Sequence, residues 1–101
     1  ADALRVVNLQ RRYLGLPALQ QDPQLQSRAE WAVQQRAVRG KSGHLNGSPV
    51  AGRKEGVGWQ SSSDSYGIWF TSCYTRATDI TYAGAAYYVH NGRTYYQFNA
   101  R

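Results

Sequence analysis

Residues 14–25 of the chain read Leu14-Gly15-Leu16-Pro17-Ala18-Leu19-Gln20-Gln21-Asp22-Pro23-Gln24-Leu25. Gly15 can adopt the left-handed conformation that ends a helix, and Pro17 prevents the helix from resuming. Asp22 can cap the next helix, and Pro23 fits the first turn of that helix, where a missing N–H costs no hydrogen bond. The stretch therefore predicts two helices joined by a short connection.

The two helices are expected over about residues 2–14 and over residues 23–39, with Gly40 ending the second. Each has an apolar stripe at helical spacing, so each should bury one face. The stripe of the first helix includes Leu4, Val7 and Leu14, next to a second row of Val6, Leu9 and Tyr13. Its predicted solvent side carries Arg5, Asn8, Arg11 and Arg12. The stripe of the second helix consists of Leu25, Ala29, Ala32, Val33 and Ala37, with Trp31 at its edge as an expected core residue.

The end of the chain predicts a β-hairpin. Two runs rich in Tyr and Val, 82–90 and 93–99, flank Asn91-Gly92, which favours a two-residue type I′ turn. This turn sets His90 opposite Arg93 and Tyr88 opposite Tyr95. Neither face of the hairpin is cleanly polar, so both faces should be covered.

A third strand is expected over 56–61, followed by a brief helix that ends near Ser72. The predicted fold class is α+β, with one domain over residues 1–101. Its architecture is an α-β-α sandwich, in which helices cover both faces of a three-stranded antiparallel sheet.

Composition limits the classes of function. The chain has 101 residues and a net charge of +6, but its ten arginines are spread along the sequence, which favours solvated basic surfaces over a nucleic-acid interface. No run approaches the roughly 18 apolar residues of a membrane helix. Cys73 is the only cysteine, so no internal disulfide can form. We expect its thiol to be buried and inert, with pairing between chains left open.

Residues 40–54 predict a long loop that contains four glycines and His44, one of two histidines. Loops of about fifteen residues are uncommon in compact domains unless they bind something. The loop is therefore a candidate binding segment.

Five motifs occur in the order found in one known family. They are the stretch 14–25, Gly43-His44, the segment 54–59 (Lys-Glu-Gly-Val-Gly-Trp), the segment 68–76 (Ile-Trp-Phe-Thr-Ser-Cys-Tyr-Thr-Arg) and the closing hairpin. In this order the chain resembles the shortened bacterial form of the CAP superfamily of cysteine-rich secretory, antigen-five and pathogenesis-related proteins. The resemblance implies the sandwich fold and a secreted or cell-surface, non-enzymatic binding module.

The family's cleft commonly joins two histidines and acidic residues that can hold zinc. Only His44 and Glu55 have matching positions here, and Tyr74 stands where the second histidine would be. A phenol is a poor zinc ligand, so we expect no metal and no cofactor. The expected cleft is formed by His44, Glu55 and Tyr74, with Trp59 and Trp69 supplying contact area.

Three interpretations of this cleft remain open. In the first, the polar residues serve only to fix the loop. In the second, they bind a small molecule, a lipid head group or a peptide. In the third, His44 acts as a general base beside Glu55. The third lacks an identifiable nucleophile, although Ser72 and Cys73 are near in sequence, so we assign no catalytic residue.

Other classes of function stay as alternatives. Eight tyrosines, three tryptophans and ten arginines suit a structural subunit of an extracellular homo-oligomeric assembly, because these residues are enriched at interfaces. A metal-dependent hydrolase is a third candidate and nucleic-acid binding a fourth.

Overall fold

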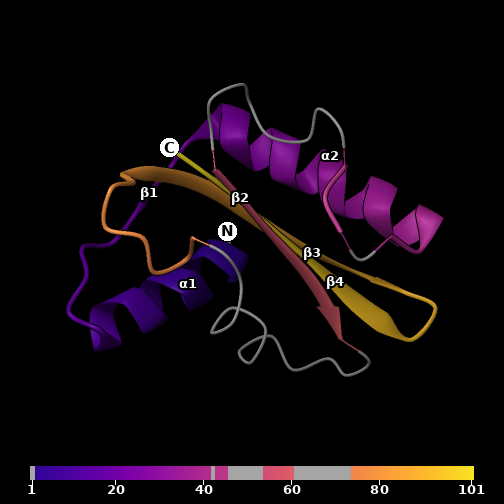
Figure 1. The fold of residues 1–101 in the computed structure, drawn as a ribbon, viewed down its shortest axis with the longest axis horizontal. Coiled ribbons are helices and arrows are strands. Elements are labelled where there is room, and N and C mark those ends of the chain that lie inside the picture. The colour runs from indigo at the N-terminus through magenta and orange to yellow at the C-terminus, as the bar shows by residue number, and fades with distance from the viewer. Residues whose placement is uncertain (1, 42, 46–53, 61–73) are drawn as a thin grey trace.

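The computed structural model describes residues 2–41, 43–45, 54–60 and 74–101. In chain order the elements are α1 (Asp2–Tyr13), β1 (Gln20–Gln21), α2 (Pro23–Arg39), β2 (Lys54–Gln60), β3 (Tyr82–His90) and β4 (Arg93–Ala100). The strands form one sheet in the order β1-β3-β4-β2 (Figure 1). The predicted α+β class is confirmed.

The two predicted helices are present. Helix α2 begins and ends at the predicted residues, and its N-terminus is capped by Asp22, whose Oδ1 accepts a hydrogen bond from the Leu25 N–H at 3.0 Å. Gly40 follows α2 in the left-handed conformation with φ 64°, and Gly15 adopts φ 76° after α1. Helix α1 ends at Tyr13, one residue before the prediction.

The hairpin also forms with the predicted register. His90 lies opposite Arg93, and Tyr88 lies opposite Tyr95. Strand β2 pairs antiparallel with β4 but begins at Lys54, two residues before the predicted strand, so that Glu55 lies within the sheet opposite Asn99.

The sheet is four-stranded and mixed, which corrects the prediction of three antiparallel strands. The additional strand, β1, lies in the connection between the helices and runs parallel to β3. Its backbone bonds run from Gln20 N to the Thr81 carbonyl and from Asp22 N to the Ala83 carbonyl, each 3.0 Å. The predicted third helix, ending near Ser72, and Cys73 lie outside the described residues.

A side chain of α1 holds the connection in this extended position. The Asn8 amide donates to the Leu19 carbonyl at 3.1 Å and accepts from the Leu19 N–H at 2.8 Å. Asn8 thus satisfies both backbone groups of Leu19, as a neighbouring strand would. Two glutamines carry no strand pattern, so β1 follows from this tertiary contact rather than from local propensity.

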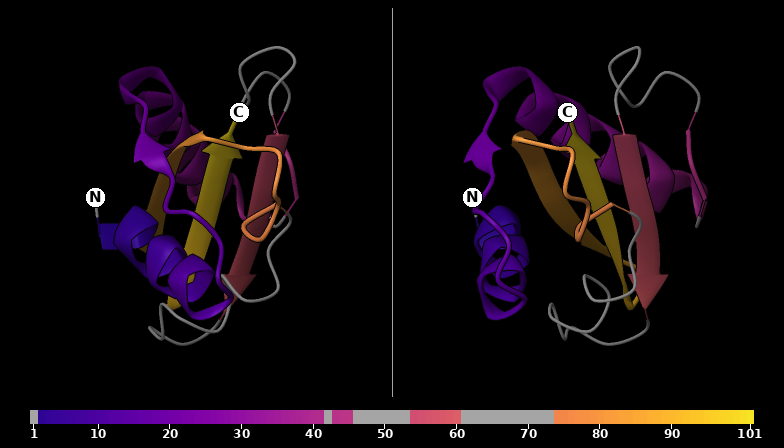
Figure 2. Two further views of the ribbon diagram at one scale, coloured as in Figure 1. Left: turned by 90° about the vertical axis from the view of Figure 1, so that its left-hand side faces the viewer. Right: turned by 60° about the vertical axis from the view of Figure 1, so that its left-hand side comes forward.

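The two helices pack on opposite faces of the sheet (Figure 2). On the α1 side, the core contains Leu4, Val7, Ala83, Ala85, Tyr96 and Phe98, together with Ala3, Val6, Leu19, Ile80 and Ala100. On the α2 side, the core contains Ala29, Val33, Ala37, Ala86 and Tyr95. The alternation of side chains along β3 and β4 divides the strand residues between these two clusters.

Several apolar predictions at the helix surfaces are wrong. Leu9, Tyr13 and Leu14 are exposed, Tyr13 by 90%, whereas Val6 of the second apolar row is buried in the core. Trp31, expected in the core, is 43% exposed and lies under the Arg28 guanidinium, 5.4 Å from the ring centre.

Helix α2 lies very close to the sheet at Gly84. A Cβ atom built on Gly84 would lie 2.2 Å from the Gln26 backbone nitrogen, far inside contact distance. Just beyond, the Gln26 amide donates to the Ala85 carbonyl at 2.9 Å and accepts from the Ala85 N–H at 3.0 Å. The first turn of α2 therefore rests directly on the backbone of β3.

Arg11 corrects the prediction that it lies on the solvent side of α1. Its side chain is buried, and its guanidinium donates to the carbonyls of Pro17, Thr75 and Ala77 at 2.8, 3.1 and 2.8 Å. Burial lowers the pKa of Arg11. The side chain ties α1 to the segment that precedes β3.

Neither described helix combines the length and the apolar character needed to cross a membrane.

Candidate functional site

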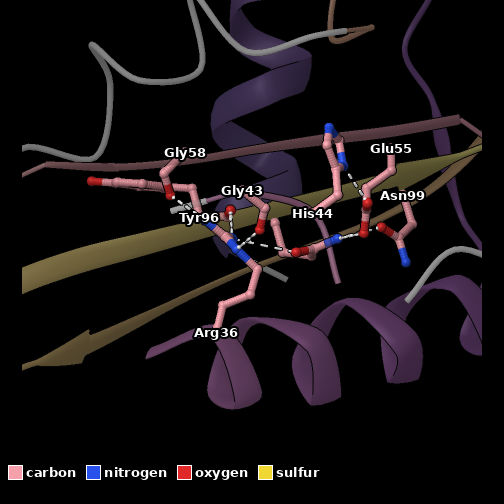
Figure 3. Close-up of polar contacts among 8 residues, drawn as sticks. Arg36, Gly43, His44, Glu55, Gly58, Tyr96 and Asn99 are labelled. Carbon is pink, nitrogen blue, oxygen red and sulfur yellow. Dashed lines mark hydrogen bonds and ion pairs between the residues drawn. The ribbon is translucent and has the colours of Figure 1, made fainter. Parts of the chain in front are cut away.

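The candidate site is built around His44, which follows α2 in the chain and contacts the second residue of β2. The imidazole Nδ1 is hydrogen-bonded to Oε1 of Glu55 (Figure 3). The His44 side chain is 55% exposed, whereas that of Glu55 is only 5% exposed. A half-exposed histidine is thus held by a buried carboxylate.

Glu55 has its second oxygen bonded from within the sheet. Gln97, on β4, donates from Nε2 to Glu55 Oε2, and also donates to Asn99 Oδ1 at 2.8 Å. Gln97 and Asn99 are completely buried on the α2 side of the sheet. The carboxylate is therefore held from both sides, by the imidazole and by a buried amide.

Arg36 lies at the inner end of the same set of contacts. It projects from α2 and donates to Gln97 Oε1 at 3.3 Å. It also donates to the carbonyls of Gly43, Gly58 and Tyr96, at 3.1, 3.0 and 2.5 Å. One guanidinium thus joins α2, the segment before His44 and two strands. We call Arg36, Gln97, Glu55 and His44 the Arg36 network.

Burial of the Arg36 guanidinium has an electrostatic cost that Glu55 offsets in part. Desolvation lowers the pKa of Arg36 to about 10, while the negative charge of Glu55 acts in the opposite direction. The guanidinium remains charged at neutral pH. A positive and a negative group are therefore both enclosed on the α2 side of the sheet, with Gln97 between them.

The donors and acceptors of the Arg36 network fix the tautomer of His44. A guanidinium can only donate, so Gln97 must turn its carbonyl oxygen toward Arg36 and its NH₂ group toward Glu55. An ionised carboxylate can only accept, so His44 must donate from Nδ1. Nε2 of a neutral His44 therefore carries a lone pair, and Nδ1 carries the hydrogen.

The structure does not bring all of the predicted cleft residues together. His44 and Glu55 are in contact, but the ring centre of Tyr74 lies 5.2 Å from Nζ of Lys54. Lys54 and Glu55 are successive residues of β2, so their side chains leave opposite faces of the sheet. Tyr74 thus lies beside Lys54 rather than beside the His44–Glu55 pair.

The contact area expected from Trp59 and Trp69 stays a prediction. The backbone of Trp59 lies in β2 opposite Tyr95, and its side chain is not described. Trp69 lies outside the described residues, as do Ser72 and Cys73.

Sequence reasoning missed Arg36, Gln97 and Asn99. Arg36 lies one helical turn after Ala32 and Val33 on the buried stripe of α2, so helical spacing alone could have placed it in the interior. Gln97 and Asn99 share a sheet face with the buried Tyr95. Buried polar side chains must be hydrogen-bonded, so two polar residues on a face expected to be covered could have indicated a buried hydrogen-bond network.

The arrangement suits recognition through one imidazole nitrogen. Within the described residues, no hydroxyl or thiol is hydrogen-bonded to His44, and no three His, Cys, Asp or Glu side chains gather closely enough to hold a metal ion. His44 can offer Nε2 as an acceptor when neutral and as a donor when protonated.

Comparison of the sequence with protein-family models and with curated proteins finds no match.

Proposed function

We propose that this chain is a secreted or cell-surface, non-enzymatic binding module of CAP-like type, in which His44 contacts a polar ligand. The order of elements, two helices followed by a strand and a closing hairpin, supports the CAP-like part. So does the contact between His44 and Glu55, the two residues at matching positions of the family's cleft.

The observation that carries the binding role is the anchoring of a half-exposed imidazole by the buried Arg36 network. A side chain that is already held in one orientation loses little freedom when a ligand binds. The exposed nitrogen is then available to a small molecule, a lipid head group or a peptide carbonyl.

Binding is favoured over catalysis because a histidine acts as a general base only on a group within hydrogen-bond reach. Among the described residues, the polar partner of the His44 side chain is Glu55. The pair can orient an imidazole without supplying a nucleophile.

The test uses the two histidines as probe and reference. We expect ¹³C-labelled His44 to shift on titration with at least one of choline, N-acetylglucosamine and N-acetyl-alanine amide, while His90 does not shift. His44→Gln should abolish this binding, and His90→Gln should retain it.

Two results would contradict the proposal. One is saturable binding of the same probe that His44→Gln leaves unchanged. The other is turnover of p-nitrophenyl acetate faster than by free imidazole and lost in His44→Gln, which would make the chain an enzyme.

A structural role in a homo-oligomeric assembly is the second candidate, and the outer edge of β3 favours it. In the described part of the sheet, this edge is paired with another strand only at Tyr82 and Ala83. Farther along, Tyr87 and Val89 are 47% and 58% exposed. Unpaired apolar edges promote association of sheets.

Sedimentation at rising protein concentration separates the two candidates. The binding-module proposal predicts a monomer throughout. An assembly would sediment faster as the concentration rises, and Val89→Lys would abolish that change because a charge on an edge strand opposes pairing.

A further inference from the structure

A cavity lies at the opposite end of α2 from Gly84, between the last turn of that helix and the β3–β4 turn. Figure 1 shows the end of α2 and the hairpin turn at the same end of the molecule. The cavity has a volume of about 450 Å³. Its lining includes Ala37, Val38, Arg39, His90, Arg93 and Tyr95, and we call it the hairpin cavity.

The backbone keeps this space open. Gly40 takes the left-handed conformation, so the chain leaves the helix axis directly after Arg39. Asn91 and Gly92, both with positive φ, reverse the chain on the other side. Two tight chain reversals therefore border the cavity.

The polar lining of the hairpin cavity is basic. Arg39 and Arg93 each carry a full positive charge, and His90 adds an imidazole. None of the described residues that line it is acidic. Positively charged side chains that meet in a concave site attract anions, and arginine suits phosphate because its planar N–H groups match the phosphate oxygens.

The rest of the lining consists of Gly40, Asn91 and the apolar residues Ala37, Val38 and Tyr95. Val38 is 68% exposed and supplies apolar surface for an organic group, whereas Ala37 and Tyr95 are buried in the core behind the cavity wall. The volume is within the range of small-molecule sites and exceeds what one phosphate group needs.

We infer that the hairpin cavity binds a small organic phosphate, with the phosphate group on Arg39 and Arg93 and the organic group against the exposed side chain of Val38. This site is separate from His44 and independent of the function proposed for it. His90 contributes a ring nitrogen at the rim and is stacked on Tyr88, with ring centres 6.4 Å apart.

Three probes separate the parts of this proposal in an NMR titration. Phenyl phosphate has both the charge and the ring, inorganic phosphate has the charge alone, and phenol has the ring alone. We expect phenyl phosphate to bind most tightly and to shift the amides of residues 37–40 and 90–95, while residues 43–45 stay unchanged.

Charge-matched variants test the arginines. Arg39→Gln and Arg93→Gln should each weaken binding of phenyl phosphate about three- to five-fold, the range for a partly exposed ion pair. Arg12→Gln removes the same charge from α1, on the other side of the sheet, and should change the affinity less than about two-fold because salt screens distant charges.

The proposal fails if Arg12→Gln weakens binding as much as Arg39→Gln does, since the attraction would then come from net charge alone. It also fails if inorganic phosphate binds as tightly as phenyl phosphate, or if the shifted amides lie outside residues 37–40 and 90–95.

Discussion

At the residue scale, the buried guanidinium of Arg36 organises the candidate site. It satisfies carbonyl groups of Gly43, Gly58 and Tyr96 and sets the orientation of the Gln97 amide. Buried charges persist when each is hydrogen-bonded and an opposite charge is near. Glu55 supplies that charge here, so the stability of the fold and the geometry at His44 depend on the same contacts.

Replacing Arg36 should therefore destabilise the fold strongly. We expect Arg36→Met to lower the free energy of unfolding by about 3–5 kcal/mol, because it leaves Glu55 as an uncompensated buried charge and leaves carbonyl groups unbonded. Urea denaturation measures this change. Arg39→Met, three residues farther along α2 and exposed, should change it by less than about 0.5 kcal/mol. Equal effects of the two variants would contradict the role given to Arg36.

The Glu55 carboxylate should determine the His44 tautomer. Arg36 holds the Gln97 amide so that its NH₂ group faces position 55. In Glu55→Gln, the new amide therefore cannot turn its own NH₂ group toward Gln97, because two hydrogen-bond donors would then face each other. It must turn its oxygen to Gln97 and its NH₂ group to His44. We expect neutral His44 to respond by moving its hydrogen from Nδ1 to Nε2, which the ¹⁵N shifts of the imidazole report. A Glu55→Gln protein that keeps the hydrogen on Nδ1 would contradict this directional argument.

At the element scale, the contact between α2 and β3 depends on the missing side chain of Gly84. A Cβ atom there would meet the Gln26 backbone, which cannot move as a flexible side chain could. We expect Gly84→Ala to lower the free energy of unfolding by at least about 1–3 kcal/mol, as overpacking does. The control is Gly43→Ala, since nothing lies within 4 Å of the added atom at Gly43. Similar stabilities of the two variants would show that α2 does not sit this close to β3.

The N-terminus of α2 should make stability depend on pH. A hydrogen bond from Arg101, followed by the one from the Leu25 N–H, lowers the pKa of Asp22 below its ordinary 3.8. Because the folded-state pKa is the lower one, the ionised carboxylate stabilises the fold above pH 3.8, and this contribution is lost as the pH falls through the folded-state value.

Asp22→Asn isolates the charge, because asparagine can still cap the helix. We expect the melting temperature of Asp22→Asn to lie below that of the wild type at neutral pH, and the difference to vanish in acid. A difference that is constant across the whole pH range would contradict the assignment to the carboxylate.

How far the sequence predicts each element depends on whether its signal is local. Helix α2 and the hairpin were predictable because Asp22, Gly40 and Asn91-Gly92 act on their own neighbours. Strand β1 was not, because the contact of Asn8 with Leu19 is what holds it beside β3. At the site, the His44–Glu55 contact matches a predicted pairing, but the place of Tyr74 depends on which sheet face Lys54 occupies.

At the scale of the whole molecule, two buried arginines perform parallel roles on the two sides of the sheet. Arg11 ties α1 to the segment before β3, and Arg36 ties α2 to β2 and β4. The N–H groups of each buried guanidinium are hydrogen-bonded to backbone carbonyls. Two of the basic residues behind the net charge of +6, Arg11 and Arg36, are therefore buried, and they connect the layers of the fold.

The two candidate binding sites also share one layer. His44 and the hairpin cavity both lie on the α2 side of the sheet, one beside β2 and the other at the hairpin turn. Arg36 and Arg39 are within one turn of the same helix, yet the first is buried and the second lines the cavity. The end of α2 therefore contributes to both sites.

The tautomer of His44 tests the Arg36 network most directly. Long-range ¹H–¹⁵N NMR at about pH 9, where imidazoles are neutral, reads the state of both ring nitrogens. The account predicts a hydrogen on Nδ1 of His44 and a bare Nε2, with His90 as the reference in the same spectrum. A hydrogen on Nε2 of His44 would contradict it, because Glu55 would then not be the acceptor that holds the ring.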